Sequence, residues 1–246
     1  MVEAPLVHRR TERGVAVLTL DSPHNRNALS AQLVKELTHC LDAVDADPKA
    51  RAVLLTHEGS TFCSGADLKG DGVRKGTRLL LTLMRRVLAL HKPVVARVNG
   101  HVRAGGLGLL AVCDISVAGS EATFAFTEAR LGLAPSVISL PVLARTDERA
   151  AARYFLTGET FRTAEAVRIG LVTAQDDALD DILAGIRASS PQGLAFSKGL
   201  TTRRLWEKVA NDGPRLARES ARLFDSPEAK EGIRAFLERR DPPWAL

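Results

Sequence analysis

The sequence is poor in aromatic side chains and in cysteine. Phe, Trp and Tyr make up 4% of its 246 residues, and three cysteines occur. An odd number of cysteines without metal-ligand spacing favours neither a disulfide framework nor a metal centre. With so few aromatics, the core must be built from Leu, Val and Ala, and a chain of this length can bury about three quarters of its unfolded surface to form one.

Long apolar runs and a strong charge of either sign are also missing. No stretch reaches the roughly 18 consecutive apolar residues of a membrane span, and the first residues lack the apolar segment of a secretory signal. The net charge of +5 is spread along the chain, which suits anionic small molecules but not nucleic acid. We therefore expect a cytoplasmic protein that binds neither a membrane nor nucleic acid.

Hydrophobic patterns divide the chain into a part that alternates strands with helices and a part made of helices alone. Ser30 is a good N-cap for an amphipathic helix that extends to Val44, and the polar stretch ending at Thr77 favours a loop. This order predicts the α/β class, with a core over residues 1–190 and a helical region over residues 191–246. Strands are expected at 15–20, 52–56, 93–98, 114–118 and 123–126, and further helices at 78–90, 107–113, 136–144, 148–156, 163–169, 178–189, 193–210, 216–224 and 227–239.

A glycine-rich turn, Asn99-Gly-His-Val-Arg-Ala-Gly-Gly-Leu-Gly108, carries the strongest chemical signal. It lies between a buried strand and a buried helix, where free backbone N–H groups and the positive end of the helix dipole are found. Such a turn binds a phosphate or stabilises an oxyanion. The turn has neither the Lys-Ser/Thr of a Walker loop nor G-x-G-x-x-G spacing, and the chain has no G-x-S-x-G elbow.

A second loop of the same kind contains Gly65 and Ala66, after the strand at 52–56. In both loops small residues allow backbone N–H groups to approach a ligand closely, as Gly105 and Gly106 do in the first. Two N–H groups that converge on one oxygen form an oxyanion hole, in which each donor is worth about 2.7–4 kcal/mol. The pair of loops therefore favours the oxyanion over the phosphate.

Cys63-Ser-Gly-Ala-Asp-Leu-Lys69 and Val98-Asn-Gly-His-Val-Arg-Ala-Gly-Gly106 together resemble the enoyl-CoA hydratase (crotonase) family. The resemblance continues through Asn25–Ser30, Glu128–Leu133 and Glu231–Arg240, and so covers almost the whole chain in the right order. It implies a crotonase-like spiral core of ββα units, followed by a helical C-terminal trimerisation region. It also implies assembly as a homotrimer or as a dimer of trimers.

The same resemblance implies the ligand and its contacts. The ligand would be an acyl-CoA thioester, with its oxygen against the backbone N–H groups of Ala66 and Gly105. Coenzyme A enters as part of the substrate, and neither another cofactor nor a metal is implied. Arg239 matches a basic contact to CoA, from the same or a neighbouring subunit. The implied binding residues are Asn25, Arg26, Ala28, Gly65, Asp67, Leu68, Gly106 and Arg239.

The chain departs from the family pattern at one position. Family hydratases carry two glutamates across the substrate double bond; the first falls on Gly108, which has no carboxylate, and the second on Glu128. Glu128 follows a strand and opens a helical turn, where an acid can also simply complement a helix dipole. An apolar pocket would raise its pKa and suit it to proton transfer.

One carboxylate is enough for a proton shuttle, and three functions follow from this. We expect an enoyl-CoA hydratase, a lyase that reversibly adds water to a 2-enoyl-CoA through an enolate. The alternatives are a Δ3,Δ2-enoyl-CoA isomerase that uses Glu128, and an acyl-CoA-binding protein without activity. Ala66 and Gly105 would contact the thioester in each of them.

Overall fold

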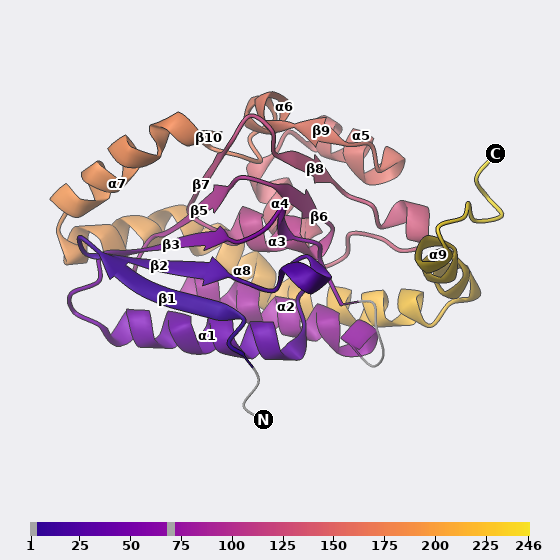
Figure 1. The fold of residues 1–246 in the computed structure, drawn as a ribbon, viewed down its shortest axis with the longest axis horizontal. Coiled ribbons are helices and arrows are strands. Elements are labelled where there is room, and N and C mark those ends of the chain that lie inside the picture. Colours follow the sequence, from indigo (N-terminus) through magenta and orange to yellow (C-terminus); the bar gives the residue numbers. More distant parts are fainter. Residues whose placement is uncertain (1–3, 68–71) are drawn as a thin grey trace.

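A twisted six-stranded sheet forms the centre of the molecule (Figure 1). The computed structural model describes residues 4–67 and 72–246. All neighbouring strands of this sheet run parallel except β1 and β2, which form an antiparallel hairpin. In spatial order the strands are β1 (Val7–Glu12), β2 (Val15–Leu20), β3 (Ala52–His57), β5 (Val94–Val98), β7 (Ile115–Ala118) and β10 (Ala174–Gln175).

The hairpin strand β1 was not predicted from the sequence. Val7 is its one buried residue, so β1 lacks the alternation by which strands are recognised. Its turn has positive φ at both Arg13 (47°) and Gly14 (78°), as the tight hairpin turns that match strand twist require. Pairing with the fully buried β2, rather than burial of its own side chains, therefore makes this segment a strand.

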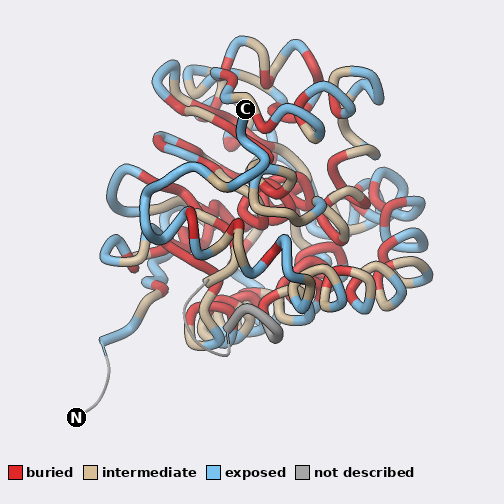
Figure 2. The backbone as a smooth tube through the Cα atoms, turned by 90° about the vertical axis from the view of Figure 1, so that its right-hand side faces the viewer, coloured by how far each residue is buried: buried red, intermediate tan, exposed pale blue. Residues whose placement is uncertain are grey.

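Helices cover both faces of the large sheet. Ala16 and Leu18 of β2 face the main core, formed with α1 (Ala31–Ala46), α2 (Gly72–Ala89) and α3 (Gly105–Val112), while Val15 and Val17 face α7 (Leu179–Ala188). Figure 2 shows the resulting buried centre and exposed outer turns. The expected cap of α1 is confirmed, because Ser30 Oγ accepts the Leu33 N–H at 3.2 Å.

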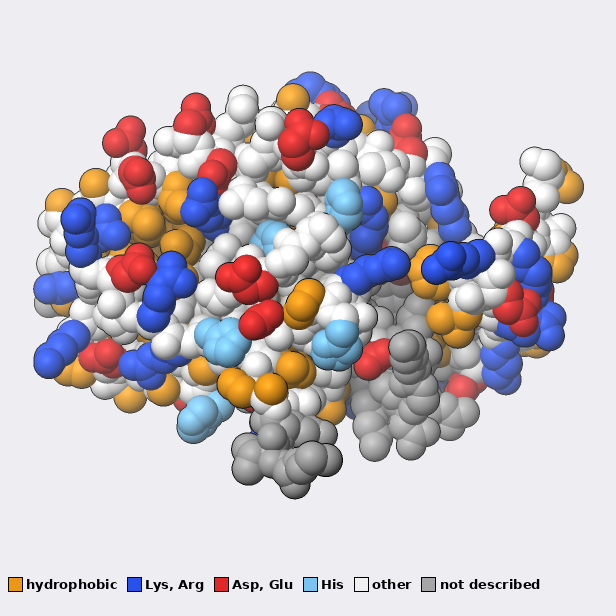
Figure 3. Space-filling model, in the orientation of Figure 1, with side chains coloured by type: hydrophobic (Ala, Val, Ile, Leu, Met, Phe, Trp, Pro, Cys, Tyr) orange, Lys and Arg blue, Asp and Glu red, His pale blue; other side chains and the backbone are white. Residues whose placement is uncertain are grey.

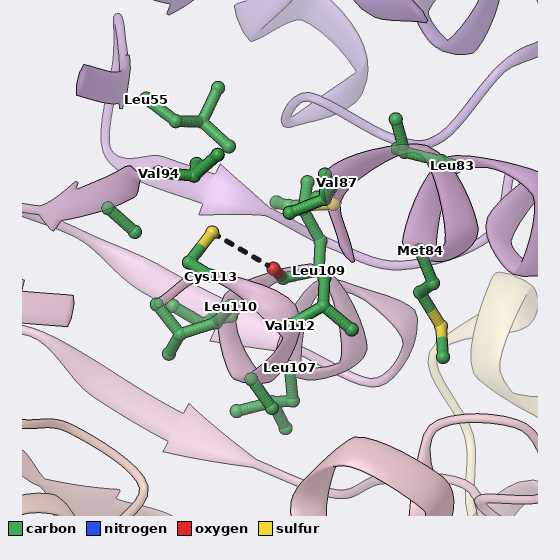
Figure 4. Close-up of a cluster of buried hydrophobic side chains, with 14 of the residues drawn as sticks. Leu55, Leu83, Met84, Val87, Val94, Leu107, Leu109, Leu110, Val112 and Cys113 are labelled. Carbon is green, nitrogen blue, oxygen red and sulfur yellow. Dashed lines mark hydrogen bonds between the residues drawn. The ribbon is translucent and has the colours of Figure 1, made fainter. Parts of the chain in front are cut away.

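Helix α3 is buried on all sides, which identifies it as a core helix rather than a surface helix. Figure 4 shows Leu107, Leu109 and Val112 among side chains from α2 and from strands of the large sheet. A helix enclosed in this way cannot shift without disrupting the core. The N-terminus of α3 is consequently a rigid point in the molecule.

A second sheet of very short strands positions the loops of interest. It consists of β4 (Thr61–Cys63), β6 (His101–Arg103), β8 (Thr123–Ala125) and β9 (Phe161–Arg162), of which β4, β6 and β8 run parallel. A strand of two or three residues has too few positions to show a period, so the sequence predicted only the one at 123–126. The predicted α/β core is nonetheless confirmed.

The C-terminal part is helical, as expected, with two differences in helix limits. Helix α2 begins at Gly72, although a loop was expected up to Thr77. Helix α8 (Pro191–Phe224) is continuous through Pro214, where two helices were expected. Gly213 lets it approach α2 so closely that an added Cβ would lie 2.7 Å from Leu81 Cδ1. The remaining helices are α4 (Ser139–Arg145), α5 (Glu148–Thr157), α6 (Thr163–Arg168) and α9 (Pro227–Glu238). None of the helices described is both long and apolar enough to cross a membrane.

A buried ion pair fastens α8 to the core. Lys198, which is 5% exposed, donates to the carbonyl oxygens of Val87 (2.9 Å) and Lys92 (3.1 Å). Its Nζ also lies 3.0 Å from Oδ2 of Asp114, which accepts the Val94 N–H at 2.7 Å. One ammonium group thus joins α8 to the end of α2, to the start of β5 and to the segment before β7.

We expect Lys198→Met to lower the free energy of unfolding by about 3–5 kcal/mol, because it leaves the Asp114 carboxylate buried without its cation. Urea denaturation measures the change. Lys208→Met, the same substitution at an exposed position of α8, serves as the control and should be close to wild type. Equal midpoints for the two variants would contradict the cost assigned to a buried Asp114 carboxylate without its cation.

Candidate active site

Three loops meet at one edge of the small sheet. The loop that contains Ala66 leaves β4, Gly105 follows β6, and Glu128 follows β8. Because β4, β6 and β8 are parallel neighbours, their carboxyl ends face the same edge, where α/β proteins commonly bind ligands. The three residues predicted to carry the chemistry therefore come from adjacent strand ends.

The first two loops touch through their backbones. A Cβ built on Gly105 would lie 3.5 Å from the Ala66 nitrogen, and a Cβ built on Gly65, whose φ is +90°, would lie 2.9 Å from the Gly105 nitrogen. Within the described part of the chain, neither the Ala66 nor the Gly105 N–H donates to a protein acceptor. Two neighbouring donors without a side chain between them match the geometry of an oxyanion hole.

The backbone conformation of Ala104 sets the direction of the Gly105 N–H group. Its φ of 46° and ψ of −121° are unusual for a residue with a side chain, and such backbone costs about 1–3 kcal/mol. The Ala104 N–H donates to the Ala125 carbonyl at 3.2 Å, while its own carbonyl accepts the Leu107 N–H at 2.9 Å. The chain thereby changes from β6 to α3 in one residue. Nothing about an alanine in the sequence signals this conformation.

Gly106 is required by close contact with the β4 strand. A Cβ at this position would lie 2.5 Å from the carbonyl oxygen of Cys63 and 2.9 Å from its Cβ. The Cys63 side chain is itself buried, and burial raises the pKa of its thiol to about 12. Cys63 is therefore a packing residue next to the donors and not a nucleophile.

Glu128 is the buried carboxylate of the site. It is 9% exposed and stands before the short turn η2 (Ala129–Leu131), as the sequence predicted. Burial raises the pKa of Glu128 to about 7, against a smaller opposing effect of its own backbone N–H. Its Oε2 atom has no hydrogen-bond partner among the described residues. A carboxyl with these properties exchanges protons near neutral pH.

The position of the absent second acid is filled by an aliphatic side chain. Gly108 lies three residues after Gly105 in α3, so both are on one helix face. A Cβ built on Gly108 would lie 2.5 Å from Cγ2 and 3.0 Å from Cβ of Ile138. No side chain fits at position 108 unless Ile138 moves. The sequence could not show this pairing, because the two residues are distant along the chain.

The two loops expected to hold CoA lie side by side. The Ser64 N–H donates to the Arg26 carbonyl at 3.1 Å, and the Leu29 N–H donates to the Gly65 carbonyl at 2.8 Å. Leu29 also forms an isolated parallel β-bridge with Ala66. These contacts place the loop with Asn25 and Ala28, just after the turn η1 (Pro23–Asn25), next to the predicted oxyanion donors.

Asparagine side chains hold this loop in shape. The Asn25 Oδ1 atom accepts the Ser22 hydroxyl (2.8 Å) and the Ala28 N–H (3.3 Å). Asn27, which sequence reasoning missed, is buried and donates to the Thr61 carbonyl at 2.7 Å. Both Arg26 and Asn27 have positive φ, which asparagine tolerates better than most residues. Asn25 thus has a structural role alongside the binding role expected of it.

The remaining predicted residues are spread over different elements. Arg26 is exposed, and Asp67 is half-buried directly after Ala66. Leu68 lies outside the described residues. Arg239 belongs to a different element: it caps α9, which packs against η2, and it is exposed.

Two further observations concern possible metal ligands and the charge of the molecular surface. Among the residues described, no three His, Cys, Asp or Glu side chains lie close enough to hold a metal ion. Figure 3 shows acidic and basic side chains interspersed on the visible face rather than gathered by sign. Among the described residues, the two predicted backbone donors and the Glu128 carboxyl are the groups that adjacent strand ends bring to this edge.

Comparison with known proteins finds relatives that match almost the whole chain. Enoyl-CoA hydratase EchA19 of Mycobacterium tuberculosis is 35% identical over 96% of this chain and 94% of its own. Mevalonyl-coenzyme A hydratase sidH of Aspergillus fumigatus is 32% identical over 94% of this chain and 91% of its own. The crystal structure of an enoyl-CoA hydratase from Mycobacterium avium superposes with a TM-score of 0.93 at 49% identity, over 99% of this chain and 100% of its own.

These relatives are similar from end to end, so their likeness concerns the whole protein and not a shared segment. The sequence profile described as enoyl-CoA hydratase/isomerase matches residues 10–245. This chain belongs to the enoyl-CoA hydratase/isomerase family.

Proposed function

We propose that this enzyme is an enoyl-CoA hydratase that adds water reversibly to a 2-enoyl-CoA. The observation that carries the proposal is the combination of two backbone donors with one buried carboxyl at the same sheet edge. The relatives named above are hydratases of CoA thioesters, which supports the same substrate class. Coenzyme A is part of the substrate, and no further cofactor enters the proposal.

The N–H groups of Ala66 and Gly105 bind the thioester oxygen. When water attacks Cβ, negative charge moves to this oxygen and an enolate forms. These main-chain donors, of which Gly105 stands at the N-terminus of the buried α3, bind the enolate more strongly than the neutral thioester. Such donors are worth about 2.7–4 kcal/mol each in the transition state.

Glu128 moves the proton. Its carboxylate takes a proton from water as the water oxygen bonds to Cβ and the π electrons form the enolate. The protonated Glu128 then delivers that proton to Cα, and the enolate electrons form the new C–H bond. One water has been added and the carboxylate is restored. Because one group serves both steps, both additions occur on the same face of the double bond.

Isomerisation is the second candidate, and the contact between Ile138 and Gly108 favours it. Because Ile138 occupies the space beside Gly108, position 108 supplies no carboxyl to hold the attacking water. Glu128 can instead remove a proton from C2 of a 3-enoyl-CoA and return it to C4, through the same enolate. The donors would have the same role in both reactions.

The wider context forms part of the proposal. Residues 1–190 would form the catalytic core and residues 191–246 the region through which three chains assemble, as a trimer or a dimer of trimers. Exposed apolar side chains on α8, Phe196 and Leu200, are in keeping with such contacts. The CoA moiety would lie along the loop from Asn25 to Ala28 and the loop from Gly65 to Asp67, in a cytoplasmic enzyme of acyl-CoA metabolism.

The proposed function is tested by absorbance of the conjugated enoyl thioester. Hydration predicts that crotonyl-CoA loses this absorbance when the enzyme is added. Gain of absorbance from 3-hexenoyl-CoA without loss from crotonyl-CoA would replace hydration by isomerisation. Binding of butyryl-CoA without turnover of either substrate would contradict both reactions.

We expect Glu128→Gln to lower kcat by about 10²–10⁴-fold while the binding of butyryl-CoA is unchanged, since only proton transfer is lost. In the wild type, kcat/KM should rise as pH increases through about 7, because the carboxylate is the form that accepts the proton. Glu121→Gln, at an exposed surface ion pair with Arg162, is the matched control. Wild-type turnover by Glu128→Gln would rule out the assigned role.

The raised pKa of Glu128 also leads to a prediction about the pH dependence of stability. Its pKa is raised by folding from 4.5 to about 7, so the native state binds a proton that the unfolded chain releases between these values. The wild type should therefore lose about 3 kcal/mol of unfolding free energy between pH 4.5 and 8, relative to Glu128→Gln. Urea titrations across this range measure the difference, and parallel curves for the two proteins would contradict the burial of a titrating carboxyl.

A further inference from the structure

We propose that the C-terminal helix α9 is a positioning element for Glu128, acting through contact between Gly232 and the carbonyl group of Leu131. The inference rests on the proposed function, since it assigns Glu128 the proton transfer. Gly232, which lies more than one hundred positions from Glu128 in the sequence, then helps to set the geometry of the reaction.

The Glu128 carboxyl takes its position from the main chain of its residue. Among the described residues, its Oε2 atom has no hydrogen-bond partner, so no such bond ties this atom to another element. The carbonyl of Glu128 in turn accepts the N–H groups of Leu131 and Leu133, both at 2.9 Å. The location of the acid therefore follows the location of the turn η2.

Helix α9 contacts η2 at two glycines. A Cβ on Gly232 would lie 2.5 Å from the carbonyl oxygen and 2.6 Å from the carbonyl carbon of Leu131. From the other side, a Cβ on Gly132 would lie 2.8 Å from the carbonyl carbon of Glu228 and 2.9 Å from the Ala229 nitrogen. Backbone meets backbone at both points, so neither partner can yield by rotating a side chain.

Two attachments hold the turn from different sides. Arg130 Nε donates to the Thr157 carbonyl at the end of α5, at 3.0 Å, through an exposed side chain. On the α9 side, Ala229, Gly232 and Ala235 are buried along the helix. Figure 1 shows α9 at the end of the molecule, away from the large sheet. A change in α9 therefore reaches Glu128 without passing through the oxyanion donors or the loop at Asn25.

The experiment adds one methyl group at this contact. In Gly232→Ala, the distance from the new Cβ to the Leu131 oxygen must grow from 2.5 Å to at least 3.4 Å to become an ordinary contact. We expect kcat to fall roughly 10- to 100-fold, because displacements of about this size are costly in catalysis. The dissociation constant for butyryl-CoA should stay within about twofold of wild type, since the donors of the oxyanion hole do not move.

The pH profile separates positioning from simple loss of folded protein. A displaced turn admits water to Glu128, so the apparent pKa in kcat/KM should fall from about 7 toward its ordinary value of 4.5. Unfolding alone lowers the amount of active enzyme and leaves that pKa unchanged. Gly185→Ala, which adds the same methyl group to α7 where nothing lies within 4 Å, should match wild type in every measurement.

A milder variant covers the case in which Gly232→Ala does not fold. Ser226 caps α9 by accepting the Ala229 N–H at 3.1 Å, and its replacement by alanine weakens the first turn of the helix by about 1 kcal/mol. Ser226→Ala should lower kcat by about two- to fivefold with the same direction of pKa change. A wild-type kcat and pH profile in either folded variant would overturn the positioning role.

Failure of the proposed function would look different. If the wild type converts neither crotonyl-CoA nor 3-hexenoyl-CoA, the proposed reaction is wrong. The pKa of Glu128 can then still be read from stability, as the pH-dependent difference between each protein and its Glu128→Gln counterpart. If this pH-dependent difference is the same in the wild-type background and in the Gly232→Ala background, the inference is refuted independently of turnover.

Discussion

The direct contact between two stretches of backbone, at Gly65 and at Gly105, is the constraint on which the rest of the structure depends. It requires residues without side chains at both points, and it brings the Ala66 and Gly105 amides together. Parallel pairing of β4, β6 and β8 supplies the loops at one edge, and the buried α3 fixes the second donor. The large sheet and its helices serve as the rigid support for this arrangement.

Local patterns in the sequence predicted most of the long elements and pointed to the residues that are proposed to carry the chemistry. The strand at 93–98, the cap at Ser30 and the turn after Glu128 depend on neighbouring residues, so they can be read from a single stretch of chain. Ala104, Ile138 and Gly232 owe their roles to distant contacts or to backbone angles. No periodicity or composition encodes such relations, which explains why sequence reasoning missed them.

Several features of the site work against the stability of the fold. Glu128 is buried without a full set of partners, and Ala104 adopts backbone angles that a residue with a side chain avoids. The aliphatic core offsets these costs, while the ion pair between Lys198 and Asp114 ties α8 to the sheet. The groups proposed for catalysis and the groups that stabilise the fold thus lie in different parts of the chain. Helix α3 belongs to both, because it carries Gly105 at its N-terminus and is buried in the core.

The proposed oxyanion donors are peptide N–H groups, and this has a consequence for how the site would appear to mutagenesis. Because every residue except proline supplies such a group, exchanging the side chain at position 66 removes no donor. A scan that replaces each residue by alanine passes over Ala66 altogether and reports Gly105 as a packing defect. Replacing the peptide bond itself by an ester, which keeps the side chains and deletes the N–H, is the change that addresses the functional group.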